Sequence, residues 1–270
     1  MLEAALRQQR WLIGAAVLVL TALAWAYTIH LAREMSAMNM SMMGMSMQSG
    51  GAMDAGAMLQ MHLTRWSFTD VATHFVMWAV MMVAMMLPSA TPAILLFLRA
   101  AGERRDSALT PATLFILGYL ASWTLFSAAA TAFQWLLHDL AFLSGSMSFD
   151  SRIAAGTVLI AAGTYQWTTL KYNCLRHCQS PIGFLFGHWK DGLMGAFQMG
   201  LLHGLYCVGC CWLLMLLLFV VGVMNLAWVA GIAIYVLAEK IIPVGPRVAR
   251  AAGIVVFAWG VLLLAGQVSV

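Results

Sequence analysis

Long apolar stretches separated by short polar segments dominate the pattern of this chain. They fall at roughly 11–32, 69–98, 111–137, 152–172, 192–221, 224–242 and 250–268. A helix needs about 20 apolar residues to cross the hydrocarbon core of a bilayer, and lipid offers no hydrogen-bond partner to an open strand. The pattern therefore predicts an all-α protein, a polytopic transmembrane helical bundle with about seven spans.

The composition agrees with this prediction. Hydrophobic residues make up 63% of the 270 residues and charged residues only 9%, whereas a soluble domain has about 25% charged residues. The first stretch follows Arg7 and Arg10, as a secretory signal would, but it is longer than a typical signal core. We expect residues 1–34 to be an N-terminal transmembrane anchor. Pro88 and Pro92 are expected to kink or break the second stretch near its inner end.

Positive charge predicts the orientation. Lys and Arg are enriched on the cytoplasmic side of membrane proteins. With the N-terminus inside and the C-terminus outside, the inner segments hold 11 of the 14 Lys and Arg residues, namely Arg7, Arg10, Arg99, Arg104, Arg105, Lys171, Arg176, Lys190, Lys240, Arg247 and Arg250. The net charge of +4 is spread over these segments, so we expect a lipid bilayer and no nucleic acid as the partner.

Residues 35–61 differ in composition from the rest. They hold ten methionines among Ser, Gly and Ala, which predicts a mobile loop within a periplasmic segment 35–66. A thioether is an uncharged soft ligand that selects copper(I) over zinc, magnesium or calcium. Met40, Met42 and Met45 are therefore candidate copper ligands. The alternative is a low-complexity linker in which methionine is merely tolerated.

The second stretch places an acid and a histidine above a methionine stripe. At about 100° per residue, the residues on this one helical face are Asp70, His74, Met77, Met81 and Met85. Asp70 and His74 are one turn apart, so they could hold one metal ion, or the carboxylate could orient the imidazole. Methionines on a buried helix face are otherwise ordinary packing material.

The fifth stretch carries a second constellation. Met199, His203, Cys207 and Cys210 share one helical face, and Cys211 lies beside it. Thiolates with an imidazole form a soft-metal site for copper(I) or zinc. Two alternatives are a dithiol redox pair, since Cys207 and Cys210 form a CxxC, and cysteine as a small apolar filler.

A polar inner loop holds the remaining two cysteines. Cys174, His177 and Cys178 could share one cytoplasmic ion, although a reducing cytosol would also leave both thiols free. Glu239, near the inner end of the sixth stretch, is expected to pair with Lys240 or Lys171.

Three blocks carry a family resemblance, at residues 77–88, 171–188 and 200–225. They resemble the bacterial family of predicted metal-binding integral membrane proteins of unknown function, over roughly residues 65–265. The resemblance implies a metal-binding membrane domain, here six spans over residues 67–270, in the bacterial inner membrane.

These features favour copper(I) handling by capture, transfer or transport, with a periplasmic copper chaperone or membrane enzyme subunits as candidate partners. The alternatives are a copper-holding accessory subunit of a membrane enzyme complex and a membrane thiol oxidoreductase. The sequence lacks the nucleotide-binding pattern GxxxxGKS, so any transport would be passive or ion-coupled. No catalytic residue is assigned.

Overall fold

The computed structural model describes residues 2–48, 67–102, 108–139, 151–242 and 244–268, with the backbone alone for residues 2–7, 39 and 42–48. Every regular element in these ranges is a helix, which confirms the all-α class for the described part of the chain. The helices are α1 (Leu2–Gln48), α3 (Phe68–Gly102), α4 (Leu109–Asp139), α5 (Arg152–Tyr165), α6 (Thr169–Gln179), α7 (Pro181–His188), α8 (Gly192–Leu216), α9 (Leu218–Val221), α10 (Leu226–Ile241) and α11 (Gly245–Leu264).

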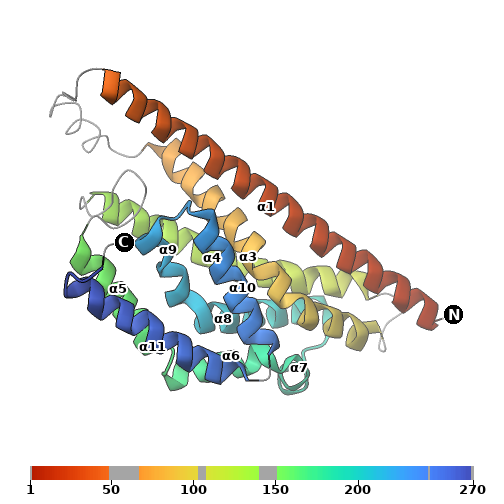
Figure 1. Ribbon diagram of the computed structural model, residues 1–270. Helices are drawn as coiled ribbons and strands as arrows, with labels where there is room; N and C mark the ends of the chain where they lie inside the picture. Colours follow the sequence, from red (N-terminus) through yellow and green to blue (C-terminus); the bar gives the residue numbers. More distant parts are fainter. Residues whose placement is uncertain (1, 49–66, 103–107, 140–150, 243, 269–270) are drawn as a thin grey trace.

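The helices form a bundle with α3, α4, α8 and α10 at its centre. The long helix α1 packs on α3 along one side, and α5 and α11 form a closely packed pair on another side (Figure 1). The short helices α6 and α7 contact each other, with α6 against α8 and α7 against α3. The first and last described residues lie at opposite ends of the bundle (Figure 1).

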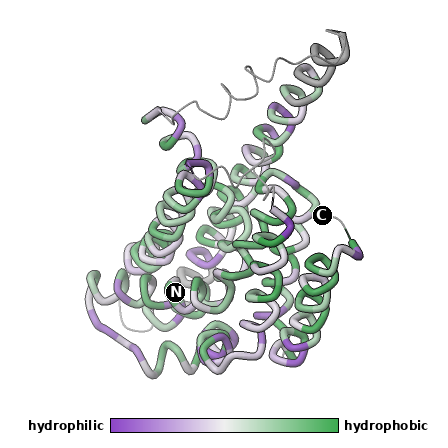
Figure 2. Tube along the Cα trace, turned by 90° about the vertical axis from the view of Figure 1, so that its left-hand side faces the viewer, coloured by the Kyte–Doolittle hydropathy of each residue, from purple (hydrophilic) through white to green (hydrophobic). Residues whose placement is uncertain are grey.

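Among the residues that the structure describes, five helices are long and apolar enough to cross a membrane: Gln8–Met38, Phe68–Gly102, Leu109–Asp139, Gly192–Val221 and Gly245–Leu264. Figure 2 shows hydrophobic colour along most of the bundle. Large apolar side chains face outward, with Trp11 73% exposed and Leu18 71% exposed, as expected for contact with lipid. Two expected spans are shorter than predicted, because the segment at 152–172 is interrupted after Tyr165 and α10 has 16 residues.

The methionine-rich segment differs from the expected loop. Residues 35–48 continue α1 as helix, because seven of them are methionine, a strong helix former, and they contain a single glycine, Gly44, and no proline. Residues 49–61 of the expected loop lie outside the described residues. Helix α3 likewise continues through Pro88 and Pro92, so these prolines do not break it.

Glycines allow α8 to approach α4 closely. A Cβ at Gly200 would overlap the carbonyl oxygen of Phe115, and one at Gly204 would lie 2.6 Å from Ser122 Oγ. The Ser122 hydroxyl also donates to the Leu201 carbonyl across the interface at 2.8 Å. Small residues four apart are a common device for close helix packing in membranes. This packing holds α8, which carries His203 and three of the cysteines, firmly against α4.

A buried ion pair joins α6 to α10. Lys171 Nζ lies 2.8 Å from Glu239 Oε1 and 2.9 Å from Oε2, and both side chains are at most 1% exposed. The Tyr235 hydroxyl donates to the same carboxylate, and the Gln179 amide donates to the Glu239 carbonyl. Glu239 therefore pairs with Lys171, the second of the two expected partners. The pair holds α6 against the bundle.

Candidate metal centre

Helix α8 places three buried thiols together. Cys207, Cys210 and Cys211 are each at most 1% exposed, and their spacing of three and four residues places them on one helical face. The thiols of Cys210 and Cys211 both donate to the Cys207 carbonyl, at 3.1 and 3.0 Å. The face expected from the sequence is therefore buried inside the bundle.

Helix α6 adds its two cysteines to the same place. The Cys178 thiol lies close enough to the thiols of Cys207 and Cys210 to interact with them, and this interaction together with burial raises the pKa of Cys178 above its ordinary value. Cys174 packs where α8 has Gly209, since a Cβ there would lie 2.8 Å from the Cys174 sulfur. The sequence placed the cysteines of α6 and α8 in separate sites, whereas the fold joins them. We name this group the thiol cluster: Cys174, Cys178, Cys207, Cys210 and Cys211.

Two polar side chains from other helices contact the Cys207 sulfur. Lys240 Nζ lies 2.8 Å from Cys207 Sγ and donates to Ser89 Oγ at 2.9 Å. The Tyr119 hydroxyl lies 3.1 Å from the same sulfur and donates to the Met86 carbonyl at 3.0 Å. A buried ammonium is costly without a negative partner, and a Cys207 thiolate would supply one. The sequence pattern did not predict that Lys240, Ser89 and Tyr119 lie near Cys207. The one sequence signal for such a site is the charged Lys240 at the end of an apolar stretch.

In the described part of the chain, no group of three or more His, Cys, Asp or Glu side chains is ready-made for a metal ion. The thiols of Cys210 and Cys211 donate to the Cys207 carbonyl, and the Cys207 sulfur accepts from Lys240. An ion at the thiol cluster would compete with these hydrogen bonds, so the thiols would have to turn toward it.

His203 is buried one turn before Cys207. Its ring lies among three aromatic rings, with centroids 5.0 Å from Phe184 and 6.0 Å from both Phe115 and Tyr119. Its Nδ1 atom has no hydrogen-bond partner, and a buried polar atom without a partner costs about 1–3 kcal/mol. An atom left in this state is a candidate ligand for an ion.

Met199, the first residue of the predicted α8 face, has a different neighbour from the cysteines. Its sulfur accepts a hydrogen bond from the Lys190 backbone N–H at 3.3 Å, which ties it to the α7–α8 connection and not to the thiol cluster.

The acid and the histidine of α3 have local structural partners. Asp70 Oδ2 accepts from the Ser67 N–H at 2.8 Å, which is the return bond of a capping box at the helix start. His74 Nδ1 lies 2.7 Å from the Asp70 carbonyl oxygen. Below them, Met77, Met81 and Met85 are buried in the hydrophobic core. A metal role for these five residues stays a prediction.

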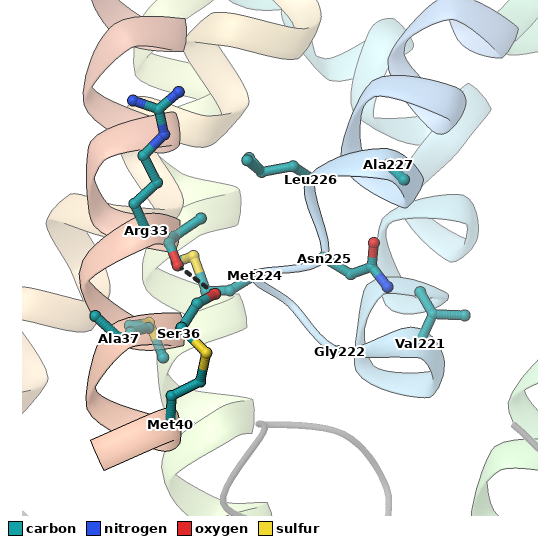
Figure 3. A pocket seen from close by; sticks show the side chains of 12 residues that line it. Arg33, Ser36, Ala37, Met40, Val221, Gly222, Met224, Asn225, Leu226 and Ala227 are labelled. Atoms are coloured by element: carbon teal, nitrogen blue, oxygen red, sulfur yellow. Dashed lines mark hydrogen bonds between the residues drawn. The ribbon is translucent and has the colours of Figure 1, made fainter.

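A cavity of about 680 Å³ lies between the C-terminal half of α1 and the α9–α10 connection. Three methionines line it, Met35 and Met40 from α1 and Met224 from the connection. Figure 3 shows Met40 and Met224 reaching toward Ser36 from the two walls. Met224 is far from the others in sequence, so only the fold could reveal it. The side chains of Met42 and Met45 lie outside the described residues.

Comparison with known proteins gives one match. Residues 75–263 match the family PpoB2, described as copper chaperone. No curated protein matches the chain, and no solved structure matches it. The matched segment contains the thiol cluster, His203 and the methionine stripe of α3. It begins after Asp70, His74 and the methionines of α1.

Proposed function

Because the chain belongs to the PpoB2 copper chaperone family, we propose that it is an integral membrane protein that binds copper(I) at the thiol cluster and passes it on. The family match supports copper handling in general. The five long apolar helices support a place in a membrane, and we propose the bacterial inner membrane, with seven spans, the N-terminus inside and the C-terminus outside.

The proposal of copper(I) binding rests on the proximity of cysteines from α6 and α8. Cys178 of α6 interacts with Cys207 and Cys210 of α8, and the Cys174 sulfur packs against Gly209, so a small ion between the two helices would reach sulfur from both sides. Thiolates are soft ligands that suit copper(I) as well as zinc, and the family match favours copper. Binding must release thiol protons. When an ion takes the Cys207 sulfur, the Lys240 ammonium keeps its bond to Ser89.

The remaining residues fit a route to this cluster. The cavity with Met35, Met40 and Met224 offers thioethers at the outer end of α1, and thioethers bind copper(I) without losing a proton. His203, with its unpartnered Nδ1, lies one turn from Cys207. Delivery to a periplasmic copper chaperone or a membrane enzyme is the proposed use. A thiol oxidoreductase is less favoured, because the α8 cysteines are buried away from soluble reductants.

Metal content tests the proposal. The protein is purified without chelators, loaded anaerobically with copper(I), and compared with a sample loaded with zinc. We expect at least one tightly held copper(I) per chain in the wild type and weaker zinc binding. A chain that takes up no copper(I) but forms a disulfide between Cys207 and Cys210 under mild oxidation would instead support the oxidoreductase.

The outer cavity gives a second prediction. The triple replacement of Met35, Met40 and Met224 by Leu keeps apolar volume and helix propensity but removes three soft ligands. We expect slower copper(I) uptake by cells or proteoliposomes, with unchanged copper at the thiol cluster at saturation. The control is Met215→Leu, which removes a buried sulfur of α8 remote from this cavity. Uptake by the triple variant equal to that of the control would exclude a capture role.

The orientation is tested by labelling with a membrane-impermeant maleimide. In a chain freed of its own cysteines, Met40→Cys places a thiol at a 70% exposed position. Gly187→Cys places one where a Cβ meets no atom within 4 Å. We expect labelling in whole cells at residue 40, and at residue 187 only after the membrane is opened. The reverse pattern would overturn the N-in orientation.

A further inference from the structure

Two histidines meet beside the thiol cluster. His177 near the end of α6 and His188 at the end of α7 have ring centroids 5.8 Å apart. The turn at Ser180 and Pro181 folds α7 back so that they meet. Both rings are half-buried, so they are accessible from outside the bundle. The function proposed above makes no use of His188.

The backbone sets the same tautomer in both neutral imidazole rings. His177 Nδ1 lies 2.8 Å from the Asn173 carbonyl oxygen, and His188 Nδ1 lies 3.1 Å from the Phe184 carbonyl oxygen. A carbonyl can only accept, so each Nδ1 carries the hydrogen and each neutral ring keeps its lone pair on Nε2. A hydrogen bond from the other ring nitrogen to a carbonyl is the usual arrangement of a metal-binding histidine. No described residue hydrogen-bonds either Nε2.

Neighbouring rings hold the pair in place. Tyr206 of α8 stacks on His177 at a centroid distance of 4.1 Å and an angle of 3°. Phe184 stacks on His188 at 5.1 Å. With metal–nitrogen bonds of about 2.0 Å, two rings that share an ion through Nε2 have centroids at most about 6.4 Å apart. The observed 5.8 Å is within this limit.

We propose that His177 and His188 form a second copper(I) site, with the two Nε2 atoms as ligands. Cys178, the residue next to His177, belongs to the thiol cluster, so this pair would exchange copper with the cluster at the α6–α7 end of the bundle. Imidazole binds copper as well as zinc. The choice of copper rests on the proposed function, whereas the two-histidine geometry does not.

Residue-resolved modification of histidines tests this in the full-length wild-type protein, in detergent, without a substitution. Diethylpyrocarbonate attaches a carbethoxy group to an unprotonated imidazole nitrogen, and mass spectrometry reports each histidine separately. Saturating copper(I) is expected to lower modification of His177 and His188 at least tenfold. His30, which is exposed and paired with Glu34 at 3.4 Å, serves as the control and is expected to react equally with and without copper.

Substitution gives an independent measure. His177→Ala and His188→Gln are each expected to lose about one copper per chain while keeping the copper of the thiol cluster, and His30→Ala to lose none. Unprotected His177 and His188 in a copper-loaded chain would overturn the second site. That result would leave the proposed function intact if the thiol cluster still held copper. Protection of both histidines in a chain whose thiols hold no copper would sustain this site and contradict the proposed function.

Discussion

Cys207→Ser is expected to remove the copper bound at the thiol cluster and to leave the protein folded in the membrane. The Cys207 sulfur is the meeting point of Cys178, Lys240 and Tyr119, so no other side chain can take its place without rearrangement. Serine keeps the shape of cysteine, but its hydroxyl is a poor ligand for copper(I). A substitution of this size costs about 1 kcal/mol of stability when only packing is lost.

Copper per chain and the thermal unfolding midpoint are measured on the same preparation. The matched control is Met215→Leu, which removes another fully buried sulfur from α8 and conserves volume. It is expected to keep all its copper. His203→Ala is expected to weaken binding, since it removes the unpartnered Nδ1 one turn away. Full copper retention in both Cys207→Ser and His203→Ala would contradict a copper site on this helix.

Breaking the Lys171–Glu239 pair is expected to destabilise the protein strongly. Both side chains are at most 1% exposed, so Lys171→Met or Glu239→Gln leaves one charge buried without its partner. Removing one member of a buried ion pair costs about 3–5 kcal/mol. Thermal unfolding in detergent measures the loss. Because α6 carries Cys174 and Cys178, weaker copper binding should accompany it.

The double variant Lys171→Met/Glu239→Gln is the control that separates charge from packing. It removes both charges, and replacing a whole buried pair by neutral groups is often close to neutral. We therefore expect it to be more stable than either single variant. Single variants as stable as the wild type would show that the pair does not hold α6 in the bundle.

The helical class followed from the length of the apolar stretches, but the place of α6 could not. Residues 173–179 are polar enough to be interpreted as an inner loop after the stretch 152–172, and hydropathy treats Lys171 and Glu239 as charges at span ends. They are buried because they pair with each other across 68 residues, a contact that no local pattern records. The helical state of residues 35–48 was missed for another reason: their small polar residues were weighted above the helix propensity of Met and Ala.

The sequence predicted the candidate site where its residues lie on one face of a single helix. The spacing of His203, Cys207 and Cys210 predicts a shared face, and the structure places all three in the core. Cys178 was assigned to a different site, because its partners lie on another helix. Tyr119 and Lys240 come from two further helices and meet at the Cys207 sulfur, and Ser89 of α3 accepts a hydrogen bond from Lys240. Composition gives such residues no common signature.

X-ray absorption at the copper edge tests most directly whether the thiol cluster binds copper(I). The wild-type protein is loaded anaerobically with one equivalent of copper(I), so that the tightest site dominates the signal. We expect the spectrum of copper(I) with sulfur atoms in its first coordination shell, and loss of that sulfur signal in Cys207→Ser. A first shell made only of nitrogen and oxygen, or a sulfur signal unchanged in Cys207→Ser, would contradict copper binding at the thiol cluster.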